Sequence, residues 1–337
     1  MKPPAFWYHD NGESPSARLF ALLLAPLSRL VTGISRRRRR NASPQRADIP
    51  TLCVGNVTVG GAGKTPVALA LAKHFLARDS DVHFLTRGYG GSARGVLRVD
   101  GYHDAALVGD EALELAAVAP CWVARDRFAG AKAASDAGAG MLILDDGLQN
   151  HRLHYDVGVL VVDGMRGLGN GRVLPAGPLR EPWDDAFARA DAVVVAGEPK
   201  QSRLRAVLSR VDPSKLFTTH LHVCPMALPP RLLAFSGIAH PEKLLGSLRE
   251  LGGNIVGSFD FPDHHRFSES DARLLLKESR RLNATPVTTN KDAMRLAHSR
   301  KGSACGLLAK SMSVLRVEAR FDDIGRFEAF ARSRMSK

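Results

Sequence analysis

A glycine-rich segment at residues 55–66 contains the residue types that bind nucleotide phosphates. It reads GNVTVGGAGKTP and lies between a short apolar run and an expected helix. Glycines let backbone N–H groups converge on phosphate oxygens, and a helix N-terminus adds positive potential. Lys64 can reach the β- and γ-phosphates and Thr65 can ligate Mg²⁺, although the strict pattern has glycine where Thr58 stands, and a structural turn is the alternative. The residues expected to bind ATP are Thr58, Val59, Gly60, Gly61, Ala62, Gly63, Lys64 and Thr65.

Two adjacent carboxylates, Asp145 and Asp146, follow the apolar run at residues 141–144. In phosphate-loop enzymes an aspartate at the carboxyl end of a strand contacts the metal. Neighbouring strand residues point to opposite faces, so we expect one aspartate to ligate Mg²⁺ and the other to act elsewhere. An Asp-Asp-Gly sequence alone is more often a turn, but together with the phosphate loop it predicts a Mg²⁺ site.

Acid–base chemistry is suggested by Asp110, at an expected helix start, and by the sequence Asp263-His264-His265. An enzyme that transfers phosphate to a hydroxyl benefits from a base near the nucleophile, and an Asp–His pair drawn from two domains could supply one. The alternatives are a helix-capping carboxylate and surface histidines.

Two arginines, Arg87 and Arg180, lie in loops rich in glycine or proline. Their guanidinium groups would suit phosphate recognition or stabilisation of charge on the transferred group. Ordinary turns would explain the glycines and prolines equally well.

The order of expected elements predicts an α/β fold. Short apolar strands alternate with helices, which favours βαβ crossovers and a doubly wound, mostly parallel sheet like that of phosphate-loop NTPases. The expected strands are 51–54, 82–86, 141–144, 157–162 and 192–196, with helices at 65–78 and 111–118. A second, smaller α/β group follows Pro229-Pro230, with strands 232–235, 254–261 and 286–289 and helices 241–251 and 268–282. We therefore expect an N-terminal segment at 1–40, a kinase core at 41–228 and a smaller α/β domain at 229–337.

Composition agrees with a folded protein of the cytoplasm. The chain has 337 residues, of which 45% are apolar, enough to bury a large core. Its four cysteines are far apart and form no CxxC pair, which argues against a zinc site or a disulfide framework.

The N-terminal segment combines apolar and basic character. Apolar residues at helical spacing run from Leu19 to Ile34 and are followed by five consecutive arginines, Arg36 to Arg40. A span needs about 20 uninterrupted apolar residues, so we expect a helix lying in the membrane interface, with Trp7, Tyr8 and the arginines at headgroup depth. The alternative is a helix packed on the protein's own core with solvated arginines. The basic cluster follows the apolar run, which argues against a cleaved signal peptide.

Taken in order, the motifs resemble those of the tetraacyldisaccharide 4′-kinase (lipid A 4′-kinase) family over nearly the whole chain. The matching segments are 6–8 (FWY), 55–61 (GNVTVGG), 87–91 (RGYGG), 109–111 (GDE), 145–149 (DDGLQ), 179–182 (LREP) and 261–264 (FPDH). Each is weak alone, but the ordered set is specific, and Thr58 belongs to this family's pattern.

The resemblance implies transfer of the ATP γ-phosphate to the 4′-hydroxyl of tetraacyldisaccharide 1-phosphate, which gives lipid IVA. It places the protein on the cytoplasmic face of the bacterial inner membrane, as a peripheral or monotopic protein. The expected partners are the lipid substrate and an anionic membrane surface, with no nucleic acid and no obligate protein partner. By this resemblance Asp110 and His264 form a dyad in which His264 helps Asp110 act as base. The catalytic set is Asp110, His264, Lys64 and Arg180, and the Mg²⁺ set is Thr65, Asp145, Asp146 and Glu181.

Two positions depart from the family's usual pattern. Two other functions remain as alternatives to this one. Asn290 stands where the family usually has glutamate, and Asn150 where it often has histidine. The alternatives are a phosphate-loop kinase for another membrane or small-molecule acceptor, and a nucleic-acid-binding NTPase that uses the arginines. The sequence Asn290-Lys291-Asp292 lacks the intervening residue of a guanine-reading motif, and no aromatic residues are interleaved with the arginines.

Overall fold

The computed structural model describes residues 4–8 and 15–335. The chain forms two compact units, each built from separate stretches of sequence. The larger unit consists of Pro3–Arg87, Asp126–Leu221 and Ala319–Lys337, and the smaller unit contains Gly88–Arg125 and His222–Glu318. The sequence analysis expected contiguous domains. Residues 88–125 instead belong with the C-terminal half because helix α5 (Asp110–Ala116) packs against helix α11 (Asn290–Leu296).

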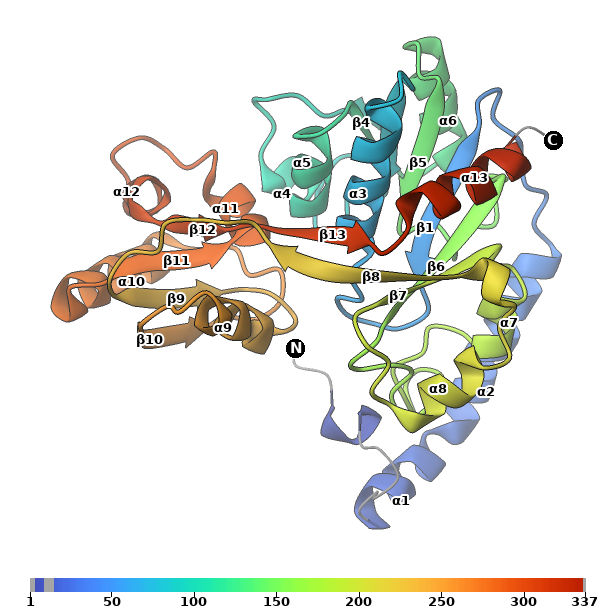
Figure 1. Cartoon of the computed structure of the whole chain (residues 1–337), viewed down its shortest axis with the longest axis horizontal. Coiled ribbons are helices and arrows are strands. Elements are labelled where there is room, and N and C mark those ends of the chain that lie inside the picture. The colour runs from blue at the N-terminus through green and yellow to red at the C-terminus, as the bar shows by residue number, and fades with distance from the viewer. Residues whose placement is uncertain (1–3, 9–14, 336–337) are drawn as a thin grey trace. The chain divides into compact units, whose positions relative to one another are not determined.

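The larger unit is built on a mainly parallel sheet (Figure 1). Its strands are β1 (Thr51–Asn56), β2 (Val82–Thr86), β5 (Met141–Asp145), β6 (Val157–Asp163), β7 (Ala192–Ala196), β8 (Leu216–Val223) and β13 (Val317–Phe321). Within this unit they follow the order β13-β8-β7-β6-β1-β5-β2, and the strands from β8 to β2 pair in parallel. Each expected strand is present. Buried strands of this kind carry apolar side chains on both faces, which is why β5, β6 and β7 are almost entirely apolar.

Central strand β1 brings the predicted phosphate loop beside the predicted acidic pair. Val54 of β1 pairs with Asp145 of β5 on one side and with Val159 of β6 on the other. In a parallel sheet the carboxyl ends of neighbouring strands share one edge, so the loop after β1 and the residues after β5 lie together. Helix α3 (Lys64–Leu76) leaves this loop and packs on β1 and β5.

The remaining helices of the larger unit are shorter or peripheral. They are η1 (Ala5–Trp7), α1 (Pro15–Leu23), α2 (Ala25–Arg40), α6 (Arg127–Asp136), α7 (Trp183–Phe187), α8 (Ser202–Leu208), η2 (Pro213–Lys215) and α13 (Ile324–Met335). Asp126 caps α6 by accepting hydrogen bonds from the backbone N–H groups of Phe128 and Ala129.

The smaller unit has its own parallel sheet of four strands in the order β10-β9-β11-β12. The strands are β9 (Leu232–Ser236), β10 (Ile255–Asp260), β11 (Thr285–Thr289) and β12 (Ser313–Leu315). The helices are α9 (Pro241–Glu250), α10 (Glu269–Leu282), α11 and α12 (Ala304–Ser311), and residues 88–125 add β3 (Val96–Arg98), α4 (Ala105–Val108), α5 and β4 (Cys121–Ala124). Leu232 and Phe235 of β9 belong to different apolar clusters, so both faces of this sheet are covered.

The N-terminal apolar segment forms two helices, α1 and α2, which are bent by 46° at a break near Leu24. Among the residues described, no single helix has the length and apolar character to cross a membrane, although this bent pair meets both conditions when taken together. Small residues, Ala17, Ala21 and Ser28, are buried. The large apolar side chains are 44–65% exposed, namely Leu19, Phe20, Leu22, Leu23, Leu27, Leu30 and Ile34. The predicted apolar stripe is therefore not packed on the unit's core.

Residues near the N-terminus are attached to the larger unit by polar contacts. The indole N–H of Trp7 donates to the carbonyl of Pro175 at 3.1 Å, and the hydroxyl of Tyr8 donates to the carbonyl of Val59 at 3.4 Å. Both aromatic side chains are half-buried. The two aromatic residues expected at headgroup depth thus bind protein loops, and Tyr8 contacts the phosphate loop itself.

Candidate active site

The phosphate loop runs from the end of β1 to the start of α3. Gly60 and Gly63 have positive φ angles of 104° and 84°, a backbone conformation that favours glycine. The side-chain amide of Asn56 donates to the carbonyl of Thr58 at 2.8 Å, and Val59 N–H donates to the carbonyl of Pro178 at 2.8 Å. The loop is therefore held from both sides although Thr58 replaces the glycine of the strict pattern.

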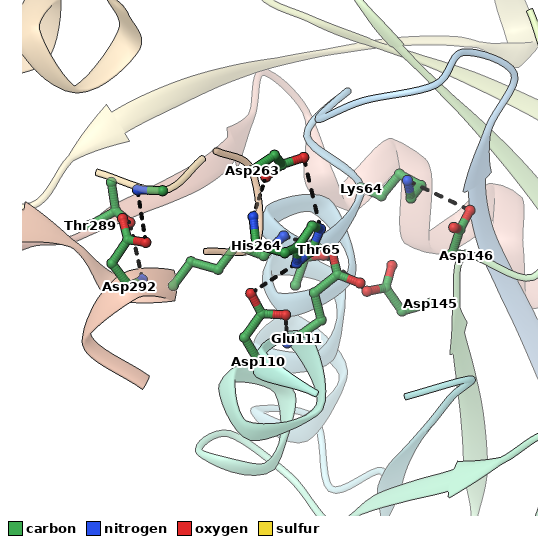
Figure 2. A network of polar contacts seen from close by, with 12 residues as sticks. Lys64, Thr65, Asp110, Glu111, Asp145, Asp146, Asp263, His264, Thr289 and Asp292 are labelled. Carbon is green, nitrogen blue, oxygen red and sulfur yellow. Dashed lines mark hydrogen bonds and ion pairs between the residues drawn. The ribbon is translucent and has the colours of Figure 1, made fainter. Parts of the chain in front are cut away.

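Lys64 and Thr65, the first two residues of α3, each contact one of the two predicted aspartates (Figure 2). Lys64 Nζ lies 3.6 Å from Asp146 Oδ1 and donates to Asn56 Oδ1 at 3.1 Å. Thr65 Oγ1 donates to Asp145 Oδ2 at 2.9 Å. Both residues are buried, so their functional groups are fixed by these contacts.

Asp145 and Asp146 do not diverge as expected for strand neighbours. Strand β5 ends at Asp145, and Asp146 has a φ of 56°, in the left-handed region. Because this turn cancels the alternation of the strand, the two carboxylates reach adjacent residues of α3. Burial disfavours the charged form of Asp146, but Lys64 and Arg180 outweigh it and hold the pKa of Asp146 below its usual value.

Arg180, which was predicted to be a catalytic residue, contacts Asp146. Its Nη1 is 3.0 Å from both carboxylate oxygens of Asp146 and donates to Gln149 Oε1 at 3.2 Å. Its backbone N–H donates to the carbonyl of Val57 in the phosphate loop. Gln149 and Asn56 complete this group. Both belong to the segments that carry the family resemblance, but their hydrogen-bonding roles were not predicted.

Glu181 is placed in a buried ion pair. It is 2% exposed, and its two oxygens accept from Nη2 of Arg189 at 2.7 and 2.8 Å. Gln149 Nε2 donates to it at 3.1 Å, and Arg39 of α2 lies 3.6 Å away. The carboxylate expected to ligate Mg²⁺ is therefore already bound by cationic and amide donors.

Of the predicted Mg²⁺ ligands, Thr65 and Asp145 contact each other directly. In the described part of the chain, no three His, Cys, Asp or Glu side chains converge as a metal cage. Magnesium usually takes one or two carboxylates and completes its shell with water and substrate phosphates. A threonine hydroxyl and an aspartate oxygen 2.9 Å apart at the end of a phosphate loop fit this requirement.

The smaller unit brings Asp110 and His264 together. Asp110 begins α5 directly after Gly109, and His264 lies in the loop between β10 and α10. His264 Nδ1 is 3.2 Å from Asp110 Oδ2. The ring of Tyr89 packs edge-on against the imidazole with centroids 5.1 Å apart. The predicted pair is formed within one compact unit, because residues 88–125 belong with the C-terminal half.

Two basic residues of α11 surround Asp110. Nε and Nη2 of Arg295 both donate to Asp110 Oδ2, and Nζ of Lys291 binds Glu111 Oε1 at 2.7 Å. Burial opposes ionisation of Asp110, but the hydrogen bond with His264 and the charges of Lys291 and Arg295 hold its pKa well below the usual range. Arg295 was not predicted, although basic residues after the expected strand at 286–289 were a visible signal.

Comparison with known proteins decides the family. The family model for tetraacyldisaccharide-1-P 4′-kinase matches residues 20–336. The chain belongs to the tetraacyldisaccharide 4′-kinase family. A relative of that name from Parvibaculum lavamentivorans is 48% identical over 326 residues, covering 96% of this chain and 95% of the relative. Another from Rhodospirillum centenum is 47% identical over 315 residues and covers 91% of each chain.

A solved structure supports the same fold. LpxK from Aquifex aeolicus, determined in complex with ATP, superposes with a TM-score of 0.72 over 94% of this chain and 99% of that one, at 24% identity. The predicted resemblance to the tetraacyldisaccharide 4′-kinase family and the predicted α/β fold class are thus confirmed. The roles of individual residues remain predictions.

Asn290 departs from the family's usual glutamate, and its surroundings explain how this chain accommodates the change. Its side-chain amide donates to Glu114 Oε1 at 3.0 Å. Burial raises the pKa of Glu114 above its ordinary value, against the effects of Asn290 and Lys291. An amide at position 290 therefore pairs with a buried carboxyl group, and a glutamate would bring a second negative charge.

Proposed function

We propose that this protein transfers the γ-phosphate of ATP to the 4′-hydroxyl of tetraacyldisaccharide 1-phosphate and so forms lipid IVA. Family membership supports the substrate, and the ATP complex of the related LpxK supports the nucleotide. The observation that carries the proposal is the buried set of contacts in which Lys64 meets Asp146 and Thr65 meets Asp145. These side chains stand at the carboxyl ends of β1 and β5, where α/β sheets bind phosphates.

In this proposal the larger unit binds the nucleotide. The backbone N–H groups of residues 58–65 would hold the phosphates, and Lys64 would neutralise the β- and γ-phosphates. Thr65 and Asp145 would hold Mg²⁺, which when bound offsets the negative charge that builds up on the phosphate oxygens. Asp146 would keep Lys64 and Arg180 oriented, because it contacts both cations.

The smaller unit supplies the acid–base pair. Asp110 stays ionised near neutral pH, because its pKa lies below its usual range. An ionised carboxylate with one oxygen turned to an imidazole can accept a proton from the attacking hydroxyl and share it with His264. We therefore assign Asp110 the role of base and His264 the role of its partner.

We also propose that the protein works at the cytoplasmic face of the bacterial inner membrane as a peripheral or monotopic protein. The exposed leucines of α1 and α2 would enter the interface, and the arginines at the end of α2 would meet anionic headgroups. Arg36 and Arg39 are not merely solvated, since both bind Asp185. Their pairing supports an α2 helix that is fixed to the unit while its apolar side stays uncovered.

The deciding experiment measures transfer from γ-labelled ATP to tetraacyldisaccharide 1-phosphate in mixed micelles with Mg²⁺. Lys64→Ala should abolish product formation, whereas Lys132→Ala, which removes an exposed lysine of α6 in the same unit, should not. Product that depends on Lys64 would establish both reaction and acceptor. Bound ATP without product would keep the phosphate-binding site and point to another acceptor.

A further inference from the structure

Arg295 of α11 is not part of the predicted site, yet it is among the most constrained cations of the smaller unit. Its side chain is only 4% exposed. Nε donates to Asp110 Oδ2 at 2.8 Å, and Nη2 donates to the same oxygen. Nη1 donates to Asp292 Oδ1 at 2.6 Å and to the carbonyl of Gly237 at 2.7 Å. All three guanidinium nitrogens are used: Nε and Nη2 bind Asp110, and Nη1 binds Asp292 and Gly237.

The carbonyl of Gly237 connects Arg295 to the second member of the Asp–His pair. It also accepts a hydrogen bond from the backbone N–H of His264 at 3.0 Å. His264 has a φ of 57°, a conformation that is unfavourable for most residues and needs support from its surroundings. Arg295 therefore binds Asp110 directly and the His264 backbone through one shared acceptor.

The space around this acceptor is closed. A Cβ on Gly237 would lie 3.1 Å from Arg295 Nη1 and 3.2 Å from Asp292 Oδ1, which is tighter than most real contacts. The backbone N–H of Gly237 donates to Asp292 at 3.1 Å. A side chain at Gly237, directly after strand β9, would therefore force Arg295 or Asp292 to shift.

The charges that face Asp110 come from three elements. They are Glu111 and Glu114 on α5, Lys291, Asp292 and Arg295 on α11, and Asp263 and His264 after β10. Lys291 is bound to Glu111, so among the described residues Arg295 is the arginine or lysine in direct contact with Asp110. Lys291 and Arg295 both lower the pKa of Asp110, and Arg295 is the one whose guanidinium hydrogen-bonds to it. A buried carboxylate that loses one of two such cations is harder to ionise.

We propose that Arg295 is a positioning residue for phosphate transfer, holding Asp110 ionised and fixing Asp110 and His264 relative to each other. This inference rests on the proposed function. Arg295 itself is assigned no contact with substrate. Replacing Arg295 should raise the pKa of Asp110, which loss of a purely structural residue would not do.

The direction of the expected pKa change of Asp110 follows from the positive charge of Arg295. Without the guanidinium, burial opposes ionisation of Asp110 with less compensation, so the pKa of Asp110 rises. An adjacent arginine typically lowers the pKa of an aspartate by about 1–3 units. The pKa of Asp110, and any acid limb of kcat that it sets, should therefore move to higher pH by about 1–3 units in Arg295→Gln. A mere loss of folded enzyme would lower kcat equally at each pH.

The experiment measures kcat and KM against pH for the full chain and four variants. Arg295→Gln should move the acid limb upward while KM for ATP changes less than twofold. Arg295→Lys should keep the acid limb near that of the wild type but lower kcat, because one ammonium cannot make the hydrogen bonds of the guanidinium to Asp110, Asp292 and Gly237 together. Asp292→Asn weakens the ion pair at Nη1 of Arg295 but leaves the guanidinium charge beside Asp110, so the acid limb of kcat should not move to higher pH. Arg281→Gln is the matched control, since Arg281 also binds an acid three residues earlier but is 63% exposed.

An acid limb that stays in place in Arg295→Gln, with the fold retained by circular dichroism, would overturn the proposal. An equal upward shift in Asp292→Asn would also overturn it, because the effect would then follow general loosening. If the wild type forms no product, the proposed reaction fails separately. The pKa of Asp110 can then be followed by NMR of ¹³C-labelled aspartate, and an unchanged value in Arg295→Gln would refute the role of Arg295.

Discussion

Replacing Glu181 with glutamine separates two roles that this carboxylate could have. The family resemblance placed Glu181 at the metal, whereas the structure shows it between Arg189 and Gln149. A Mg²⁺ ligand and the anion of a buried ion pair respond differently to loss of charge. We expect Glu181→Gln to lower stability and to leave the Mg²⁺ requirement unchanged.

The expected loss of stability in Glu181→Gln follows from the contacts of Glu181 and Arg189. Removing one partner of a buried ion pair costs about 3–5 kcal/mol. Arg189 is 18% exposed and keeps its hydrogen bond to the carbonyl of Asp185 at 2.7 Å. Glutamine can still accept one bond, so we expect a smaller loss than this, about 2–3 kcal/mol. At about 2–4 °C per kcal/mol for a unit of this size, the melting temperature should fall by about 4–12 °C.

The assay measures thermal unfolding together with the Mg²⁺ concentration that gives half-maximal phosphate transfer. Asp145→Asn is the comparison: loss of a true ligand should raise this concentration at least about tenfold. Glu181→Gln with Arg189→Gln should recover part of the lost stability, because neither charge is then left unpaired. A tenfold rise in the Mg²⁺ requirement of Glu181→Gln with an unchanged melting temperature would refute the ion-pair assignment.

Three further predictions concern the other parts of the protein. Asp110→Asn and His264→Ala should each lower kcat by roughly 10²–10⁴ with little change in ATP affinity, and full activity in both would contradict the proposed base. Asn290→Glu should lower the urea midpoint by placing a carboxylate against Glu114, at a cost of about 1–3 kcal/mol, and adding Glu114→Gln should restore it; an unchanged midpoint in the single variant would argue against the contact. Deleting residues 1–40 should weaken binding to anionic liposomes, and equal binding of the truncated and full chains would remove the proposed role of that segment.

The strands of the larger unit and the motifs at their ends could be predicted because their signal is local. Residues 52–54 and 141–144 are uninterrupted apolar runs, and both lie fully buried in β1 and β5. Where neighbouring parallel strands end, polar residues that follow them must share an edge. The proximity of the phosphate loop to Asp145 therefore followed from sequence order and fold class together.

Contacts between distant segments had no such signal. The grouping of residues 88–125 with the C-terminal half depends on α5 packing against α11, and helical periodicity does not identify a partner. The role of Arg295 depends on the same packing. The left-handed turn at Asp146, which redirects its carboxylate toward Lys64, is a single backbone angle that an Asp-Asp-Gly sequence only permits.

The N-terminal helices show a predicted apolar stripe and a break that was not predicted. Periodicity predicted an apolar stripe from Leu19 to Ile34, and those side chains are exposed on α1 and α2. The break near Leu24 was not predicted, although Pro26 lies in the first turn of α2, where proline is accommodated and an uninterrupted helix is disfavoured. The small residues between the leucines face the unit, which allows α2 to approach closely: Ser28 Oγ donates to the carbonyl of Val173 at 2.7 Å.

Asn56 explains how the phosphate loop tolerates its departure from the strict pattern. The amide nitrogen of this residue, the last of β1, donates to the carbonyl of Thr58 and lies 3.2 Å from its hydroxyl. Its amide oxygen accepts from Lys64 Nζ. One side chain thus supports the position where glycine is missing and orients the lysine that would bind phosphate. The strict pattern relies on backbone freedom at this point, whereas this chain uses a buried amide, so we expect Asn56 to support the proposed phosphate site together with the glycines.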